Sequence, residues 1–412
     1  MPSEALNSTG SNGKLSPLPY HWSIRDYLKD EEPELWRWFS SNEVRAGQAD
    51  AVRLDLLKTT YRLESAAYPQ LYESAEEVLG ILGLKVPVTF YQAQAGGGLN
   101  AEIAFLPGQA HIILIGPVIN TLSANEFRAM LGHELAHFAL FDGWDGELLV
   151  VSEVLRALSN DTSAHSCHLE SSRLFRLYSE IFADRGALAV TADALVAIAT
   201  LVKFGTGLNE VSAESYLRQA EEIFTKSQVK ADHLTHPEPY IRARALKLFA
   251  DHGENASREI ERLIEGAPTL HPLDLVAQRK VANHTRQLIG HLLAPPWFRT
   301  EPVLAHARLF FPDFAPIVDA GPLLALADVI KSADPSLQDY YCYVLLDFVA
   351  VDRELEEAPL AAALELSQNL GLDKRFSQIA LRELGITKKR FASIERDAGN
   401  IVQRAHAAAA AP

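Results

Sequence analysis

Two histidines and a glutamate in residues 131–138 (LGHELAHF) have the types and spacing needed for metal-dependent hydrolysis. Residues four apart on a helix project from the same face, so His133 and His137 can offer imidazole nitrogens to one metal ion. Glu134 lies beside them and can act as a general base toward water. The alternative is a helix with two partly buried histidines in ordinary hydrogen bonds. A catalytic zinc usually has three protein ligands, so a third must be found.

The neighbouring sequence predicts the elements that position this motif. Residues 123–126 (SANE) have the form of a capping box, so a helix is expected to begin near Ala124. Apolar residues follow at three- and four-residue intervals, and the helix is expected to end at Asp142 and Gly143. Upstream, β-branched and aromatic segments between turn residues predict a small sheet. Its three expected strands are VPVTFYQAQ (86–94), LNAEIAFL (99–106) and AHIILIG (110–116).

The position of the third ligand distinguishes between classes of zinc hydrolase. A thermolysin-like site would need Glu about 19 or 20 residues after the second His, where Arg156 and Ala157 stand. A metzincin would need Gly and His at the positions of Leu140 and Gly143. Both strict patterns are therefore excluded.

The best remaining candidate for the third ligand is Glu180, in YSEIFADRGAL. Asp184 follows four residues later on the same predicted helix face and can accept the second N–H of a zinc-bound imidazole. The alternative for Asp184 is a salt bridge to Arg173, Arg185 or a neighbour. Three other glutamates lack such a partner and are weaker ligand candidates: Glu147, Glu153 and Glu170.

Three segments together resemble a known family. GHELAHF, EIFADRGA about forty residues later, and THPEPYIRARAL resemble the HtpX-like zinc metallopeptidases. This gluzincin family also contains the CAAX prenyl protease and the mitochondrial quality-control protease Oma. The resemblance covers roughly residues 56–249. It implies that His133, His137 and Glu180 bind one Zn²⁺ and that Glu134 is the general base.

The resemblance also implies how substrate is bound. It places residues 100 and 101 at the opening of an edge strand along which substrate lies, and it brings His236 and Arg242 to the cleft from the far side. Strand addition by an extended peptide gives the same expectation on physical grounds. Positive charge or donors at His236 and Arg242 would stabilise the oxyanion of a tetrahedral intermediate. The alternatives are a helix-entry histidine before Pro237 and a solvated or paired arginine on a helix. The strand residues expected to bind substrate are Asn100, Ala101 and Glu102.

Composition limits the partners and the setting. The 412-residue chain has 53 acidic and 38 basic residues and a net charge of -15, so nucleic acid is not expected as a partner. Its two cysteines fit a reducing compartment, and we expect a cytoplasmic protein. The longest apolar stretch, residues 186–202, contains Thr191 and Asp193 and falls short of the roughly 20 residues of a spanning helix. No integral membrane segment is expected.

The C-terminal part is expected to form a second domain. The pattern LLDFVAVDRELEEAP and the residues around it resemble a TerB-like helical domain, which would recruit or regulate a protein partner. Its acidic residues predict a solvated face, with a cation site as the alternative: Asp347, Asp352, Glu354 and Glu357. We expect a disordered leader (1–20), a zinc metallopeptidase domain (21–265), a connector (266–300), the TerB-like domain (301–403) and a disordered tail (404–412).

These observations predict a mainly α fold with a small β-sheet: a zincin-type metallopeptidase core followed by a C-terminal helical bundle. The predicted function is a soluble zinc endopeptidase acting on extended or unfolded polypeptide. The alternative is a peptidase-like zinc-binding adaptor or regulatory protein that acts mainly through its C-terminal helical domain. The intact set of His133, Glu134, His137 and Glu180 favours the enzyme, because an adaptor has no need of the base.

Overall fold

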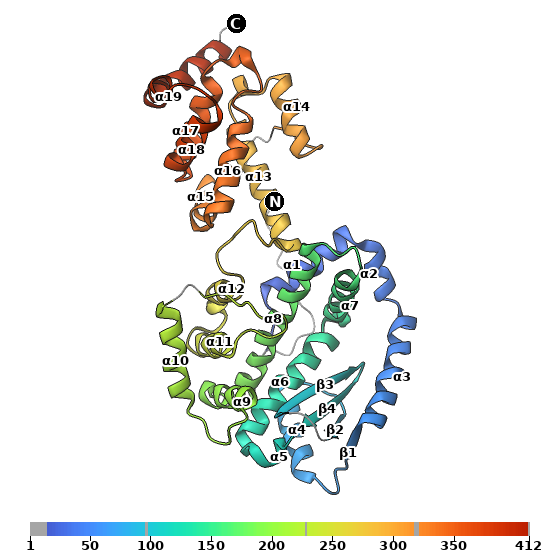
Figure 1. The fold of residues 1–412 in the computed structure, drawn as a ribbon. Coiled ribbons are helices and arrows are strands. Elements are labelled where there is room, and N and C mark those ends of the chain that lie inside the picture. Colours follow the sequence, from blue (N-terminus) through green and yellow to red (C-terminus); the bar gives the residue numbers. More distant parts are fainter. Residues whose placement is uncertain (1–14, 95–97, 227–228, 317–320, 411–412) are drawn as a thin grey trace. The chain divides into compact units, whose positions relative to one another are not determined.

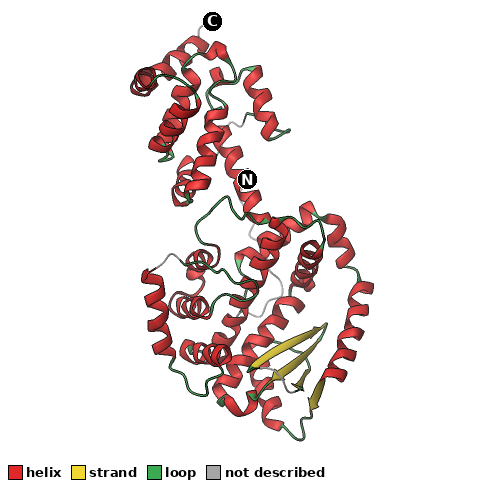
Figure 2. Cartoon of the chain, viewed as in Figure 1, coloured by secondary structure: helices red, strands yellow, loops and turns green. Residues whose placement is uncertain are grey.

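The protein is mainly helical with one small sheet, as predicted (Figure 2). The computed structural model describes residues 15–94, 98–226, 229–316 and 321–410. The chain divides into two compact units, of which the first ends at Gly266 and the second begins at Ala267. Within the described residues, no helix combines the length and the apolar character needed to cross a membrane.

The sheet of the first unit has four strands in the order β1-β2-β4-β3. The strands are β1 (Thr60–Leu63), β2 (Val88–Ala93), β3 (Asn100–Leu106) and β4 (Gln109–Ile115). β2 and β4 are parallel, and the other pairs are antiparallel. The three predicted strands are confirmed, and β1 is a fourth strand beyond those predicted. This topology leaves β3 at an edge of the sheet.

Twelve α-helices of the described residues belong to the first unit. Their order along the chain is α1 (Pro19–Glu31), α2 (Pro33–Phe39), α3 (Asn42–Thr59), α4 (Pro69–Leu82), α5 (Val118–Thr121), α6 (Ala124–Asp142), α7 (Glu147–Asn160), α8 (Ser166–Thr191), α9 (Ala194–Thr206), α10 (Ala213–Lys226), α11 (Pro239–His252) and α12 (Ser257–Glu265). The predicted capping box is present at the start of α6: Ser123 Oγ accepts from the Glu126 amide, and Glu126 Oε2 accepts from the Ser123 amide at 2.8 Å. Helix α8 ends at its C-cap residue Ala192, where the backbone adopts a left-handed conformation, and α9 follows directly.

Apolar faces of α4 and α6 cover one face of the sheet (Figure 1). Val78 of α4 and Leu131 and Leu135 of α6 pack against Phe90 and Ile112 of the sheet, and all five are fully buried. Burying side chains of this size stabilises the fold by about 1.5–3 kcal/mol each. The motif helix is therefore held rigidly by its apolar side, which leaves its other side for the site.

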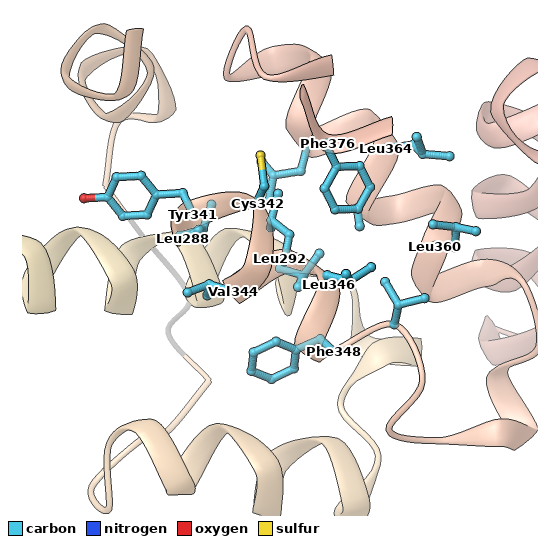
Figure 3. Close-up of a cluster of buried hydrophobic side chains, with 14 of the residues drawn as sticks. Leu288, Leu292, Tyr341, Cys342, Val344, Leu346, Phe348, Leu360, Leu364 and Phe376 are labelled. Atoms are coloured by element: carbon cyan, nitrogen blue, oxygen red, sulfur yellow. The ribbon is translucent and has the colours of Figure 1, made fainter. Parts of the chain in front are cut away.

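The second unit is a helical bundle around its own core (Figure 3). Its helices are α13 (Leu275–Leu292), α14 (Glu301–Phe310), α15 (Leu323–Ser332), α16 (Pro335–Asp347), α17 (Ala358–Asn369), α18 (Asp373–Glu383) and α19 (Lys388–Ala410). Figure 3 shows Leu288 and Leu292 of α13 together with Tyr341 and Phe348 in this core.

Helices extend beyond the predicted domain limits. The expected connector (266–300) contains α13, and the apolar face of this helix is part of the core of the second unit. The expected tail (404–412) continues α19 as far as Ala410. At the other end, α1 begins at Pro19 and Leu18 is buried, while residues 1–14 of the expected leader lie outside the described residues.

Candidate metal centre

A close crossing of α6 and α8 brings the predicted ligands together. Gly132 and Gly186 lie at the crossing, where a Cβ on Gly186 would be 2.4 Å from Gly132 O and 2.4 Å from Ala136 Cβ. Only hydrogen fits at this point, so the two backbones touch. His133 and His137 on α6 consequently face Glu180 on α8.

Three side chains form a group that is able to hold a metal ion. The ligand atoms of His133, His137 and Glu180 lie within 4.8 Å of one another. His133 Nε2 is 3.5 Å from Glu180 Oε2, and His137 Nε2 is 3.3 Å from Glu180 Oε1. Each imidazole therefore directs Nε2 toward the same carboxylate. This is the predicted ligand set.

The chemistry of this donor set fits zinc. Two imidazole nitrogens and one carboxylate are a usual set of three protein ligands for catalytic zinc. Glu180 Oε2 is buried and has no hydrogen-bond partner among the described residues. The cationic atoms beside this oxygen, Arg242 Nη1 at 3.4 Å and His133 Nε2 at 3.5 Å, make no hydrogen bond to it, and coordination of a cation would satisfy it.

Asp184 contacts the ligand His133, and Arg242 in turn contacts Asp184. His133 Nδ1 is 3.1 Å from Asp184 Oδ1, which is the predicted contact to the second imidazole nitrogen. Arg242 donates from Nε to Asp184 Oδ2 at 2.8 Å and from Nη2 to Asp184 Oδ1 at 2.6 Å. Its Nη1 lies 3.4 Å from Glu180 Oε2. All three side-chain nitrogens of Arg242 therefore face carboxylates.

The charges of the site shift several pKa values. Burial by itself would raise the pKa of Glu180, but His137, His133 and Arg242 outweigh it and hold the pKa well below its usual range. Burial likewise opposes ionisation of Asp184, and Arg242 and His133 lower its pKa. Burial would lower the pKa of His133, whereas the hydrogen bond to Asp184 and the nearby carboxylate of Glu180 raise it to about 10. The carboxylates thus favour a cation at this position.

All ten predicted site residues line one cavity of about 460 Å³. Glu134 is buried in the wall of the cavity, and this burial raises the pKa of its carboxyl group. His133 and His137 act in the opposite direction but do not outweigh the burial. Edge strand β3 forms another part of the wall. The ten residues are His133, Glu134, His137, Glu180, Asp184, His236, Arg242, Asn100, Ala101 and Glu102.

His236 approaches the ligands from the turn that precedes α11. Its Nε2 is 3.4 Å from Glu180 Oε1, and its Nδ1 is 2.9 Å from Thr235 Oγ1. Burial lowers the pKa of His236, although 59% of its side chain remains exposed. The contact across the cavity agrees with the predicted position of this residue.

The three weaker ligand candidates lie in other ion pairs. Glu147 accepts from Arg25 at 3.1 Å and also pairs with Lys29, which ties α7 to α1. Glu153 pairs with Arg156, and Glu170 pairs with Arg173. Asp184 pairs with Arg242 and not with the helix neighbours Arg173 or Arg185 that were weighed as alternatives.

Sequence reasoning missed the apolar part of the cavity and the glycine crossing. The apolar wall comes mainly from α6, α8 and α9, with residues Ala129, Met130, Ala187, Ala197, Leu201 and Phe204. Its members are ordinary core residue types, so the sequence carries no signal for them. The crossing did have a signal, because Gly132 directly precedes the first histidine and Gly186 follows Asp184 by two residues.

Comparison with known families agrees with this geometry. Residues 69–250 match the family model of Peptidase family M48. The matched segment includes β2–β4, α6, α8 and most of α11, and so all ten cavity residues named above. A search of curated proteins found no match.

Proposed function

We propose that the protein is a zinc endopeptidase of extended or unfolded polypeptide, because residues 69–250 match the model of Peptidase family M48, whose peptidases are zinc-dependent. The observation that carries the proposal is the group of His133, His137 and Glu180 on a cavity whose wall includes an edge strand. The ligands offer a metal site, and the strand offers a peptide site beside it.

The residues of the cavity have three different roles: metal binding, proton transfer and orientation of a ligand. Zn²⁺ held by His133, His137 and Glu180 would supply Lewis-acid chemistry, which polarises a carbonyl group and lowers the pKa of water to about 7. Glu134, in the cavity wall, accepts a proton from the attacking water and delivers it to the departing amine. Asp184 holds the tautomer of His133 through Nδ1, so that Nε2 is free for the metal.

We assign substrate binding to the edge strand β3. Among the described strands β3 pairs only with β4, so backbone groups on its other side remain available to a peptide. Ala101 is paired with Leu114 of β4, and its neighbours Asn100 and Glu102 are exposed. A peptide that adds to this edge must be extended, which favours unfolded segments as substrates.

We assign oxyanion stabilisation to His236. The Thr235 hydroxyl lies 2.9 Å from His236 Nδ1 and can donate to it. In that tautomer the proton is on Nε2, which faces the cavity at Glu180. An N–H at this position can donate to the oxygen that becomes negative when the carbonyl is attacked.

The proposed subfamily, the nature of the second unit and the cellular location are supported by the sequence. The motifs support a place among the HtpX-like and CAAX-prenyl-protease-like members, and the pattern in the second unit supports a TerB-like domain that binds a protein partner. Cysteine usage supports a cytoplasmic location. An adaptor role is the less favoured alternative, because Glu134 lies in the cavity and an adaptor needs no base.

The test compares zinc content and casein cleavage in three proteins. Glu134→Gln removes the base and should lower kcat about 10²- to 10⁴-fold while one zinc per chain is retained. Glu153→Gln changes a half-buried residue of α7 that pairs with Arg156 and lies outside the cavity, and this variant should behave as wild type. The proposal fails if zinc-loaded wild type leaves casein intact, or if Glu134→Gln cleaves it at the wild-type rate.

A further inference from the structure

The turn that carries His236 is anchored at both ends and exposed in the middle. We define the His236 turn as residues 231–238 (ADHLTHPE). Ala231, Pro237 and Glu238 are buried, whereas residues 232–236 are exposed. The first anchor is backbone: the Ala231 amide donates to Leu263 O at 3.0 Å. An exposed five-residue span has many conformations, so it needs further contacts to hold one histidine in place.

Arg173 supplies contacts at the start of the turn. Its Nη1 donates to Ala231 O at 3.0 Å and to His233 O at 3.1 Å. Its Nε and Nη2 donate to the two oxygens of Glu170, each at 2.7 Å. The bidentate pair fixes the plane of the guanidinium group and leaves Nη1 aimed at the turn.

Glu238 supplies contacts from the end of the turn. Its Oε1 accepts from the Asp232 amide at 3.0 Å and from the His233 amide at 3.2 Å. Glu238 is itself buried, so these bonds are shielded from water. Residue 233 is thus held through both its carbonyl and its amide, three positions before His236.

We propose that Arg173 and Glu238 are positioning residues that hold the His236 turn against the metal centre. The proposal rests on the proposed function, in which His236 stabilises the oxyanion. Arg173 and Glu180 are seven residues apart on α8, about two helical turns, and therefore lie on one face. A single helix presents the metal ligand and clamps the turn that brings His236 to within 3.4 Å of that ligand.

The first test is a double-mutant cycle on casein cleavage. Arg173→Met keeps the aliphatic stem and removes every donor, and it should lower kcat/KM about 10- to 100-fold at unchanged zinc content. In a His236→Ala background the same change should lower kcat/KM less than about 2-fold, because Arg173 acts on catalysis only by holding His236 in place. Effects that simply multiply would overturn the proposal, as would wild-type kcat/KM in Arg173→Met.

Matched variants separate positioning from loss of structure. Arg156→Met removes another arginine paired with a glutamate three residues earlier, on α7, and should leave kcat/KM unchanged. Glu238→Gln keeps an acceptor oxygen for the two amides and should retain most activity, whereas Glu238→Leu should match Arg173→Met. Equal loss in Glu238→Gln and Glu238→Leu would overturn the role of that acceptor.

Hydrogen exchange of the hydrogen-bonded amides of Ala231, Asp232 and His233 provides a readout that does not depend on activity. Arg173→Met should accelerate exchange there at least about 10-fold, and Arg156→Met should not. If exchange is unchanged in Arg173→Met, Arg173 does not hold the His236 turn, and the proposed function itself is not affected. Failure of the zinc-loaded wild type to cleave casein would instead overturn the proposed function, and with it the catalytic role of the turn.

Discussion

Substitution of Gly186 by Ala is expected to separate the two helices that carry the metal ligands. The added Cβ would lie 2.4 Å from Gly132 O and 2.4 Å from Ala136 Cβ, which is about 1 Å inside ordinary contact distance. Both neighbours belong to α6, and neither is the end of a flexible side chain. The helices must therefore move apart, and Glu180 and Asp184 move away from His133 and His137.

The magnitude follows from two opposing effects. Overpacking of this kind costs about 1–3 kcal/mol. Replacing Gly by Ala inside a helix stabilises it by about 1 kcal/mol. The net loss of stability should be between about 0 and 2 kcal/mol, which a folded domain tolerates. A displacement of about 1 Å between ligands and base should lower kcat roughly 100-fold.

The assay measures kcat on casein, zinc affinity by competition with a chelator, and unfolding by urea. Gly80→Ala is the matched control, because a Cβ at Gly80 of α4 would meet nothing within 4 Å. This control should be about 0.5–1 kcal/mol more stable than wild type and fully active. Wild-type kcat and zinc affinity in Gly186→Ala would show that the close crossing does not set the geometry of the site.

Three further predictions concern stability. Burial lowers the pKa of His21 to about 3, so its neutral form contributes stability that is complete above about pH 6.5. As the pH falls from 6.5 toward 3, the free energy of unfolding should decrease by up to about 1.4 kcal/mol per pH unit. His21→Gln keeps an acceptor for the Leu18 amide and should flatten this slope in urea unfolding between pH 7 and pH 4; parallel slopes would contradict the reasoning. Lys203→Met leaves Glu126 buried without its 2.8 Å ion pair and should cost roughly 3 kcal/mol in urea unfolding, whereas a cost below about 0.5 kcal/mol would show that the pair is dispensable. Zinc at about 1,000 times its Kd should stabilise the chelator-treated wild type by about 4 kcal/mol and raise its Tm, but should leave the Tm of Glu180→Ala nearly unchanged; an equal rise in both would remove Glu180 from the ligand set.

Local patterns predicted the elements that carry the site. The capping box and the apolar spacing predict α6 because they depend on residues within a few positions of each other. The same is true of β2, β3 and β4, which are bounded by turn residues. β1 was missed because a four-residue strand has too few residues to show a period, and its partner β2 is distant in the sequence.

Domain limits were less predictable than the elements. The segment around α13 has prolines on both sides and was expected to be a connector, but its apolar face completes the core of the second unit. Whether a helix is a linker or part of a core depends on what packs against it. That information is not contained in the helix itself.

The sequence by itself determined the donor types and their spacing: two imidazoles and a base on one helix, and a carboxylate followed four residues later by another on a second helix. Only the tertiary structure decided which charges meet. It paired Arg242 with Asp184, placed Arg173 against the His236 turn, and left one oxygen of Glu180 without a hydrogen-bond partner among the described residues. The physical reason is that side-chain spacing follows from the geometry of one helix, whereas contacts between helices depend on how closely their backbones approach. Here that approach depends on Gly132 and Gly186, two residues without side chains.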